Sequence, residues 1–304
     1  MAQEETKVKM LYQVWEGNNK FLFEGRLIFG PEVRPLFIVI LAIAGPAIGF
    51  CVNLNCIIRQ KIEEHEDASS LYLILLIGSL LTILVLTLLF LTSSTDPGII
   101  PRGSSKPLDE SLDMTNTYAK TPSLSIPKTK EVTVNGRKVK VKYCKTCSIY
   151  RPPRASHCSI CNNCVQRLDH HCEYLGQCIG LRNFRLFFFF ISTTTILFIY
   201  ISVCSWINLH KRDVASIVLA GYCFIAAWIV GFFTIYHCHM ICTNETTHEN
   251  LSTFEEEDNP YNKGILQNIK EVMFSNIPFP PPLVVDFQSI VDQGDILPLQ
   301  WTPT

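Results

Sequence analysis

The sequence predicts an α-helical integral membrane protein, with four transmembrane helices and a cytosolic, two-zinc Cys/His-rich domain inserted between helices 2 and 3. Two observations carry this prediction. Four apolar runs of more than 20 residues contain no Asp, Glu, Lys or Arg, and a helix of that length reaches about 30 Å, the thickness of a bilayer core. Between the second and third runs, residues 144–178 contain seven cysteines and three histidines.

The predicted spans are residues 36–58, 71–94, 186–209 and 214–236. A buried core helix is also apolar, but four such runs in a chain of 304 residues are typical of a membrane protein. Residues 1–19 are polar and charged, so we expect no cleavable signal peptide, and the first span should direct insertion. The expected remainder is a lead-in (1–35), a linker with a β-hairpin (95–143), the Cys/His-rich domain (144–185) and a tail (243–304).

The distribution of basic residues predicts the orientation. Residues 93–185 carry 15 Lys or Arg against seven Asp or Glu, whereas residues 59–70 and 210–213 carry two basic residues each. Because cytosolic loops are enriched in Lys and Arg, we expect the Cys/His-rich domain and both termini to lie in the cytosol. A reducing cytosol favours metal binding or thiol chemistry over disulfides.

Three segments outside the cysteine block have informative patterns. Residues 104–127 are rich in Ser, Thr and Pro and predict a flexible linker. Asn135-Gly136 lies between two alternating runs and predicts a β-hairpin that leads into the first cysteine. Apolar residues at helical spacing in the tail predict an amphipathic helix that packs against the Cys/His-rich domain or lies on the membrane: Ile265, Ile269, Val272 and Met273.

The spacing of the cysteines predicts two metal sites. Cys144/Cys147 and Cys158/Cys161 are CxxC knuckles, a spacing that lets two sulfurs face one ion. Two tetrahedral zinc sites need eight ligands, whereas the block offers ten, which leaves one Cys and one His beside Asp169. Since the ligands interleave along the chain, we expect them to alternate between the two ions. Zinc should supply much of the folding free energy of so short and polar a segment.

Two other interpretations of the block are weaker. An iron–sulfur cluster generally uses four cysteines without histidine. Paired zinc knuckles often bind nucleic acid, but this domain is tethered between two spans at the bilayer surface. We therefore expect no nucleic-acid partner, and we expect the basic residues to meet anionic headgroups or a phosphate-bearing cosubstrate.

The run Asp169-His-His-Cys172 resembles the signature of the DHHC family of integral-membrane protein S-acyltransferases. The resemblance rests on the array CxxC, HCxxCxxC, DHHC and a final Cys, and it extends over residues 19–298. Three elements outside the block resemble the family's DPG, TTxE and C-terminal elements, namely Asp96-Pro97-Gly98, Thr246-Thr247-His248-Glu249 and Asn259-Pro260-Tyr261. The lead-in Gly-Arg-x-Ile-Phe-Gly-Pro is most similar to the plant-type members.

The resemblance implies a role for each residue of the block. One zinc ion would be held by Cys144, Cys147, His157 and Cys164, and the second by Cys158, Cys161, His171 and Cys178. Cys172 would be the nucleophile, His170 its base, and Asp169 the residue that orients His170. Cys172 would take a palmitoyl group from palmitoyl-CoA and pass it to a cytosolic cysteine of a membrane-associated protein. An accessory subunit is a further partner to consider.

The acyl chain and the CoA head should occupy different surroundings. A chain of ~16 carbons gains about 0.8 kcal/mol per buried methylene, so we expect it among the spans, with the CoA head in the cytosol. The candidate contacts for CoA phosphates are Arg151, Arg154, Arg182 and Arg185. Asn183 and the TTxE residues are expected to brace the domain, and His237 and His239, at the membrane boundary, to be structural.

The chain departs from the family directly after Cys172, where Pro-Trp is replaced by Glu173-Tyr174. A carboxylate beside the nucleophile disfavours the thiolate and repels CoA phosphates. The alternative function is therefore a catalytically weak or silent, zinc-stabilised membrane adaptor of the same family. A channel or transporter is disfavoured, because no Asp, Glu, Lys or Arg lies inside a span. Golgi, endoplasmic reticulum and plasma membrane are all consistent with the sequence.

Overall fold

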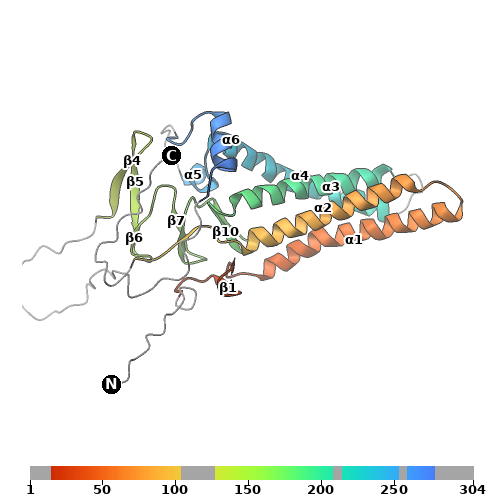
Figure 1. The fold of residues 1–304 in the computed structure, drawn as a ribbon, viewed down its shortest axis with the longest axis horizontal. Helices are drawn as coiled ribbons and strands as arrows, with labels where there is room; N and C mark the ends of the chain where they lie inside the picture. The colour runs from red at the N-terminus through yellow and green to blue at the C-terminus, as the bar shows by residue number, and fades with distance from the viewer. Residues whose placement is uncertain (1–14, 104–126, 208–213, 253–258, 278–304) are drawn as a thin grey trace, which may run out of the picture.

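Four long helices form a bundle, and short strands at one end of the bundle build the Cys/His-rich domain (Figure 1). The computed structural model describes residues 15–103, 127–207, 214–252 and 259–277. Almost all of the predicted linker lies outside the described residues. The long helices are α1 (Arg34–Glu63), α2 (Ser69–Ser94), α3 (Phe184–Ile207) and α4 (Val214–Thr243).

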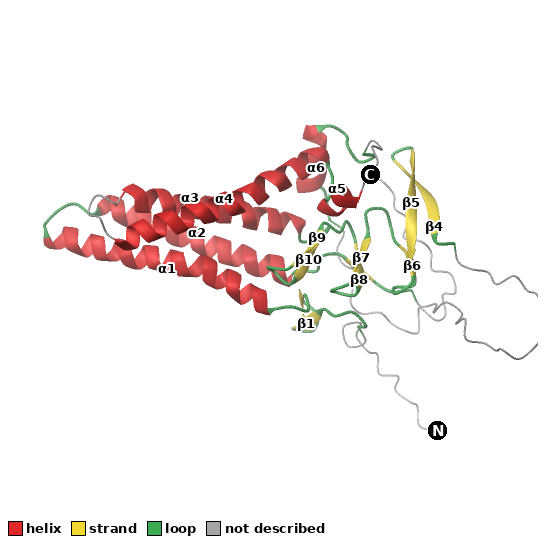
Figure 2. Ribbon diagram, turned by 180° about the vertical axis from the view of Figure 1, so that it is seen from behind, coloured by secondary structure: helices red, strands yellow, loops and turns green. Residues whose placement is uncertain are grey.

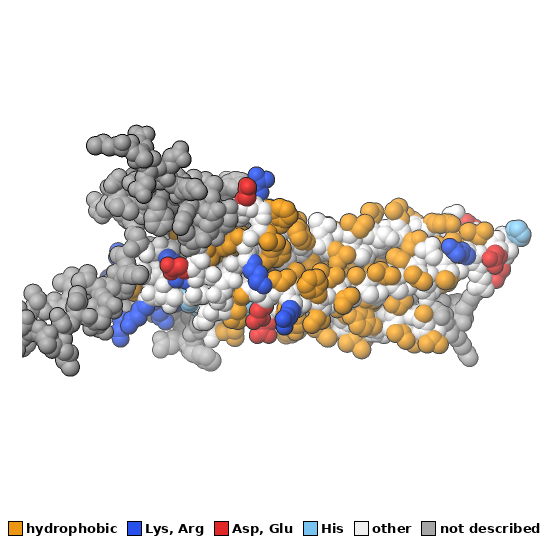
Figure 3. All heavy atoms as spheres, turned by 90° about the horizontal axis from the view of Figure 1, so that it is seen from below, with side chains coloured by type: hydrophobic (Ala, Val, Ile, Leu, Met, Phe, Trp, Pro, Cys, Tyr) orange, Lys and Arg blue, Asp and Glu red, His pale blue; other side chains and the backbone are white. Residues whose placement is uncertain are grey.

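The bundle presents apolar side chains to its surroundings. Leu41 on α1, Ile83 on α2 and Phe232 on α4 are 70%, 62% and 68% exposed. On the face shown in Figure 3, apolar side chains predominate along the helical part, and charged side chains lie toward its two ends. Each helix is long and apolar enough to cross a membrane, and a helix satisfies nearly all of its backbone hydrogen bonds internally, as lipid surroundings require. The chain is therefore a multi-pass membrane protein, as the sequence predicts.

A proline inside α1 is accommodated by a contact from α4. Pro46 has no N–H to donate to the carbonyl of Ala42, one turn earlier. The hydroxyl of Tyr222 donates a hydrogen bond to that carbonyl at 3.0 Å. The contact satisfies a carbonyl that lipid could not, and it fixes α1 against α4.

α3 joins the bundle core to the Cys/His-rich domain. It begins directly after that domain and packs against both α2 and α4. Its buried side chains recur along its length, from Phe187 to Ile201. The same apolar core includes Cys172, Leu175 and Ile179. The core is thus continuous from the membrane helices to the last strands of the domain.

Short antiparallel strands make up the Cys/His-rich domain and the segments around it. These are β3 (Ile99–Ile100), β4 (Thr129–Val134), β5 (Arg137–Cys144), β6 (Ile149–Tyr150), β7 (Ser156–Cys158), β8 (Asn163–Val165), β9 (His170–Cys172) and β10 (Gln177–Ile179). They form the sheets β4-β5-β6, β3-β8-β7 and β10-β9. The hairpin predicted at Asn135-Gly136 is present between β4 and β5, with both turn residues at positive φ (49° and 77°).

The N-terminal lead-in packs against the loop that follows Cys172. It forms a hairpin of β1 (Lys20–Leu22) and β2 (Leu27–Phe29). Asn19 donates a 3.2 Å hydrogen bond to Gln177, at the start of β10. Gly30 lies so close to Gly176 that a Cβ on Gly30 would be 1.6 Å from the Gly176 carbonyl oxygen. Larger residues at these two positions would push the lead-in away from the loop.

The C-terminal segment returns to the junction between the bundle and the domain (Figure 2). It forms α5 (Thr247–Ser252) and α6 (Ile265–Phe274). α6 is the predicted amphipathic helix; it packs against α4, and its apolar face joins the core that the bundle shares with the last strands of the Cys/His-rich domain. Val272 is buried, and Ile269 and Met273 pack on the core, whereas Ile265 is 61% exposed. One of the four predicted apolar positions therefore faces outward.

Candidate functional site

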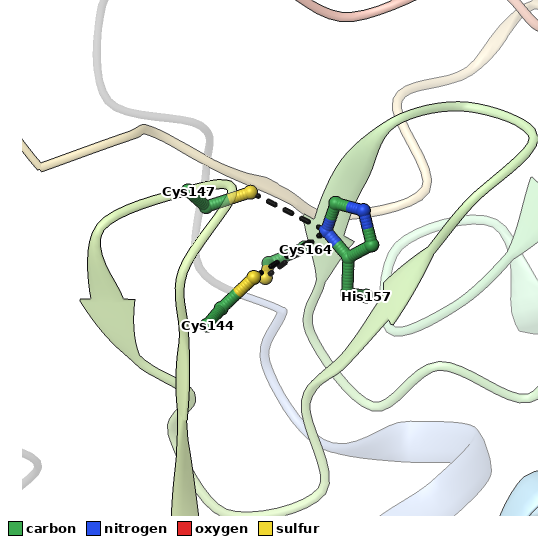
Figure 4. A group of neighbouring side chains, drawn as sticks. All are labelled: Cys144, Cys147, His157 and Cys164. Atoms are coloured by element: carbon green, nitrogen blue, oxygen red, sulfur yellow. Dashed lines mark hydrogen bonds between the residues drawn. The ribbon is translucent and has the colours of Figure 1, made fainter. Parts of the chain in front are cut away.

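The first group of candidate metal ligands consists of Cys144, Cys147, His157 and Cys164 (Figure 4). The Nδ1 atom of His157 lies 3.5, 3.4 and 3.8 Å from the sulfurs of Cys144, Cys147 and Cys164, respectively. Cys144 ends β5, and Cys147 lies in the turn before β6. His157 and Cys164 are cross-strand partners in β7 and β8. Two hairpins thus bring the four side chains together.

The second group consists of Cys158, Cys161, His171 and Cys178. The Nδ1 atom of His171 lies 3.6, 3.4 and 3.6 Å from the sulfurs of Cys158, Cys161 and Cys178, respectively. His171 and Cys178 are cross-strand partners in β9 and β10. Each group therefore receives a knuckle and one His/Cys pair that faces across a hairpin.

Strand geometry explains how neighbouring residues serve different sites. Successive side chains of a strand point to opposite faces. His157 and Cys158 are consecutive in β7, so one faces the first group and the other the second. In β9 the same alternation directs His171 to the second group, while His170 and Cys172 share the opposite face.

Both groups fit a tetrahedral metal ion. Bonds of ~2.3 Å to sulfur and ~2.05 Å to nitrogen at tetrahedral angles separate these ligand atoms by about 3.6 Å. The observed separations are 3.4–3.8 Å in the two groups. All six cysteines are buried. The two clusters can hold two metal ions, and with four protein ligands each they leave no position open for a substrate.

His170 and Cys172 lie on the other face of β9, toward the helix bundle, and Asp169, directly before the strand, contacts the His170 ring. The Nδ1 atom of His170 is 2.7 Å from Oδ2 of Asp169, and the His170 side chain also interacts with the Cys172 thiol. Cys172 is 7% exposed and belongs to the apolar cluster of the bundle. The imidazole thus lies between a thiol and a carboxylate in space, as in groups of side chains that activate a nucleophile.

The Asp169 carboxylate is anchored by the TTxE element. Asp169 is 1% exposed. Thr247, at the start of α5, donates its backbone N–H to Oδ1 at 3.0 Å and its hydroxyl to Oδ2 at 2.9 Å. Burial by itself would raise the pKa of Asp169, but its interactions with His170, His237 and Thr247 outweigh burial and hold the pKa well below its usual range. The carboxylate is therefore charged at neutral pH.

The charge of His170 follows from its partners. Burial opposes protonation of the ring, but the hydrogen bond to Asp169 and the nearby Cys172 side chain outweigh it and raise the pKa of His170 to about 9. The ring therefore carries a proton on both nitrogens at neutral pH. The Asp169–His170 pair holds a proton next to the Cys172 sulfur.

His237 also reaches this site, which its position in the sequence does not predict. The histidine is 4% exposed, and its Nε2 atom lies 3.6 Å from Oδ2 of Asp169. The expectation that His237 is merely structural is therefore incomplete. One signal in the sequence points to it, since an ionisable residue at the end of a membrane span is often functional. His239, two residues further on, is exposed.

Arg154 connects the domain to the TTxE and C-terminal elements. Its guanidinium donates two hydrogen bonds to the Glu249 carboxylate, at 2.8 and 2.7 Å, and one to the Asn244 side chain at 2.9 Å. The guanidinium also stacks 4.3 Å from the ring centre of Tyr261. The Arg154 side chain is 9% exposed. It braces the domain against the end of α4, and no free edge of the guanidinium is left for a phosphate.

The other arginines that were expected at CoA phosphates lie in different surroundings. Arg182 forms an ion pair with Asp96 of the DPG turn, and Arg185 donates to the carbonyl of Val272 in α6 at 2.8 Å. Arg151 is partly buried, and its Nε atom has no hydrogen-bond partner within the described part of the chain. Three of the four arginines are therefore engaged within the protein.

Asn183 braces the start of α3. It is fully buried and donates to the carbonyls of Cys178 at 2.9 Å and Thr92 at 3.3 Å. Its side-chain oxygen accepts from the N–H of Gly180 at 2.9 Å. These bonds fix the last strand of the domain to the ends of α2 and α3.

Glu173 and Tyr174, the two departures from the family pattern, point away from the site. Both are exposed, Tyr174 to 69%, whereas the preceding Cys172 is buried. A turn at Gly176, with φ of 61°, returns the chain to β10. The Glu173 charge therefore lies in solvent rather than in the apolar cluster around the thiol.

The fold and the site define a class: a multi-pass membrane protein with a two-metal Cys/His-rich domain whose Asp-His-His-Cys strand packs on the membrane helices. The family model described as DHHC palmitoyltransferase matches residues 137–253. The chain is 46% identical over 301 residues to probable protein S-acyltransferase 2 of Arabidopsis thaliana, covering 93% of this chain and 72% of that protein. It is also 46% identical over 300 residues to probable protein S-acyltransferase 1 of Arabidopsis thaliana, covering 93% and 87%. The chain belongs to the DHHC family of protein S-acyltransferases, and the predicted similarity to plant-type members is confirmed.

Proposed function

We propose that this protein transfers a palmitoyl group from palmitoyl-CoA to cysteines of membrane-associated proteins, through an acyl-enzyme at Cys172. One observation carries the assignment of Cys172. Its thiol is buried in the apolar cluster of the membrane helices, and the residue shares a strand face with His170. A nucleophile at this boundary can reach the thioester carbon of an acyl-CoA whose acyl chain lies among the helices and whose CoA head lies in water.

In the first step, Cys172 attacks the carbonyl carbon of palmitoyl-CoA as a thiolate, its thiol proton having passed to His170. The new carbon–sulfur bond replaces the bond to the CoA sulfur, which leaves as a thiolate. His170, which is protonated at neutral pH, gives a proton to that leaving sulfur. Asp169 keeps the ring oriented through its 2.7 Å hydrogen bond to Nδ1.

In the second step, a cysteine of the protein substrate attacks the acyl-enzyme. Its thiol proton passes to His170, its sulfur takes the acyl carbon, and Cys172 leaves as a thiolate. One thioester replaces another in both steps, so the reaction is nearly balanced. The same imidazole therefore serves as acid in one step and base in the next.

The acyl chain is expected to lie along the bundle next to Cys172. Burial of ~16 carbons at about 0.8 kcal/mol per methylene contributes on the order of 12 kcal/mol toward keeping the chain out of water. Leu175, Ile179 and Phe187 belong to the same apolar core as Cys172, so the wall of that core is apolar. This placement supports long acyl chains as the substrate class.

We infer that zinc occupies both Cys/His groups. Three sulfurs and one imidazole in tetrahedral spacing suit zinc better than harder cations. When bound, each ion supplies folding free energy rather than chemistry, because four protein ligands complete its coordination. The ions hold β7–β8 and β9–β10 in place, and β9 in turn holds His170 and Cys172.

Arg151 is the arginine that we favour for a CoA phosphate. The Nε atoms of Arg151 and Arg182 are both buried without a partner in the described part of the chain, but Arg182 pairs with Asp96, and Arg154 and Arg185 also have partners within the chain. The Arg151 side chain forms no ion pair or hydrogen bond among the described residues. We also propose that the termini and the Cys/His-rich domain face the cytosol, as the basic residues indicate. An accessory subunit and the choice among endomembranes and plasma membrane stay predictions from the sequence.

Labelling with an alkyne-tagged palmitate tests the proposal. Purified wild type should acquire label that neutral hydroxylamine releases, and Cys172→Ser should acquire none. Cys56→Ser is a matched control, because Cys56 is an exposed cysteine on α1 and should leave labelling unchanged. Equal labelling of wild type and Cys172→Ser would overturn the assignment of Cys172. A wild type without label above background would favour the silent adaptor.

A further inference from the structure

His237 lies at the meeting point of the membrane helices and the Asp-His-His-Cys strand. It belongs to α4, six residues before that helix ends at Thr243. Its ring centre is 5.9 Å from that of His170. Phe187 of α3 packs against both imidazoles, with ring centres 5.3 Å from His170 and 5.1 Å from His237. The ring is thus held on one side by aromatic packing and faces the Asp169 carboxylate on the other.

The hydrogen bonds of His237 determine which nitrogen faces the site. Its Nδ1 atom lies 2.9 Å from the carbonyl oxygen of Phe233, one turn earlier in α4. A carbonyl only accepts, so Nδ1 carries a hydrogen. The Nε2 atom lies 3.6 Å from Oδ2 of Asp169. It is buried and has no hydrogen-bond partner within the described ranges. A buried ring nitrogen aimed at a charged carboxylate calls for an explanation.

Packing alone does not provide that explanation. An apolar side chain of similar size would fill the same space without placing a polar atom next to the carboxylate, and burying such an atom unpaired has a cost. A metal ion does not explain the group either. The 2.7 Å between His170 Nδ1 and Asp169 Oδ2 is a hydrogen bond, whereas two ligands of a tetrahedral ion with ~2.0 Å bonds lie about 3.3 Å apart.

We propose that His237, with a hydrogen on both ring nitrogens, is a positioning residue for acyl transfer, which holds the Asp169 carboxylate so that His170 stays aligned with Cys172. This inference rests on the proposed function. Oδ2 of Asp169 accepts from His170 and from Thr247, and His237 Nε2 approaches the same oxygen from α4. The carboxylate is therefore restrained by the domain, by α5 and by a membrane helix. Movement of α4 would change the direction of the His170 ring.

The structure provides substitutions that separate positioning from packing. The amide nitrogen of glutamine reaches about as far as Nε2 and always carries hydrogens, whereas the shorter asparagine amide matches Nδ1. His237→Gln therefore keeps a donor toward Asp169, and His237→Asn keeps only the donor toward Phe233. His239→Asn is a matched control, because His239 is an exposed histidine of the same helix turn.

The test measures palmitoyl-CoA turnover, Cys172 labelling, metal content and melting temperature for the full chain in detergent. His237→Asn should lower kcat about tenfold, the lower end of the 10- to 100-fold loss typical when a residue that orients a reactive group is removed. The KM for palmitoyl-CoA should stay within about twofold of the wild-type value. His237→Gln should recover most of the kcat, and His239→Asn should match wild type. Both His237 variants should keep two metal ions per chain.

Three results would overturn the inference while leaving the proposed function intact. Equal kcat for His237→Asn and His237→Gln would leave no role for the donor at Nε2. A change confined to KM would place His237 in substrate binding. If both variants lose activity together with bound metal, or together with a lower melting temperature, the residue acts in folding. Absence of Cys172 labelling in wild type would instead refute the proposed function itself, and the positioning role with it.

Discussion

Replacing Asp169 with asparagine should disable His170 while keeping the shape of the site. The carboxylate accepts hydrogen bonds at both oxygens, from Thr247 and from His170. An asparagine amide has a single acceptor oxygen, so its NH2 group must face one of these donors. If the NH2 group faces His170, the ring must place its hydrogen on Nε2, which is the wrong tautomer for exchange with Cys172.

The size of the effect follows from the charge that His170 loses. The pKa of His170 is about 9, against an ordinary value of 6.5, and the difference corresponds to about 3 kcal/mol. Burial opposes the charged ring, and Asp169 is its main stabilising partner. Without that carboxylate the pKa should fall to the ordinary value or below. In wild type the ring is charged below pH 9 and loses its proton as the pH rises through that value.

The assay is the initial rate of Cys172 acylation by palmitoyl-CoA between pH 6 and 10, corrected for hydrolysis with Cys172→Ser. Wild type should lose activity above about pH 9. Asp169→Asn should lose activity as the pH rises through about 6.5 or a lower value. Its rate at pH 7.5 should be about 100- to 10,000-fold below that of wild type, as in other nucleophile–base–carboxylate sets. Asp67→Asn is the control, because that aspartate is exposed at the start of α2. An Asp169→Asn protein with both metals, an unchanged pH profile and a rate within threefold of wild type would refute the reasoning.

Three further predictions concern stability and the departures from the family. Arg154→Met should destabilise the protein by about 3–5 kcal/mol, because it leaves Glu249 without its guanidinium partner; Lys138→Met, which breaks an exposed pair with Glu131, should cost less than about 1 kcal/mol in the same thermal unfolding assay. Removing metal with a chelator should unfold the Cys/His-rich domain and abolish acylation, and zinc but not magnesium should restore both; activity that survives complete metal loss would contradict this. Glu173→Gln should change the acylation rate by no more than about threefold, because its charge is exposed and screened; a tenfold gain would show that Glu173 faces the thiol.

Several elements could be predicted because they depend on local pattern. The spans follow from continuous apolar runs, and the hairpin at Asn135-Gly136 from turn chemistry. The structure also brings together the two metal groups that the family resemblance implies. The physical reason for their interleaving, the alternation of side chains along β7 and β9, appears only once those strands are seen.

Other features depend on contacts between distant segments. The sequence suggests CoA phosphates as partners of four arginines, whereas Arg154 and Arg182 are paired with Glu249 and Asp96. The charge of an arginine is visible in a sequence, but its partner is chosen by the packing of α4 and the DPG turn against the domain. The exposed position of Glu173 is likewise seen only in the structure, where the chain turns at Gly176 against the lead-in.

The sequence by itself determined the membrane class, the ligand inventory of the two metal sites and the family, because these depend on hydrophobic runs, ligand spacing and motif identity. Only the tertiary structure decided what surrounds the reactive strand. It buries Cys172 in the core of the bundle, anchors Asp169 on Thr247 and brings His237 from α4 to the same carboxylate. These contacts join segments that share no local pattern, and they form because α3 and α4 close on the face of β9 that the metal ligands leave free.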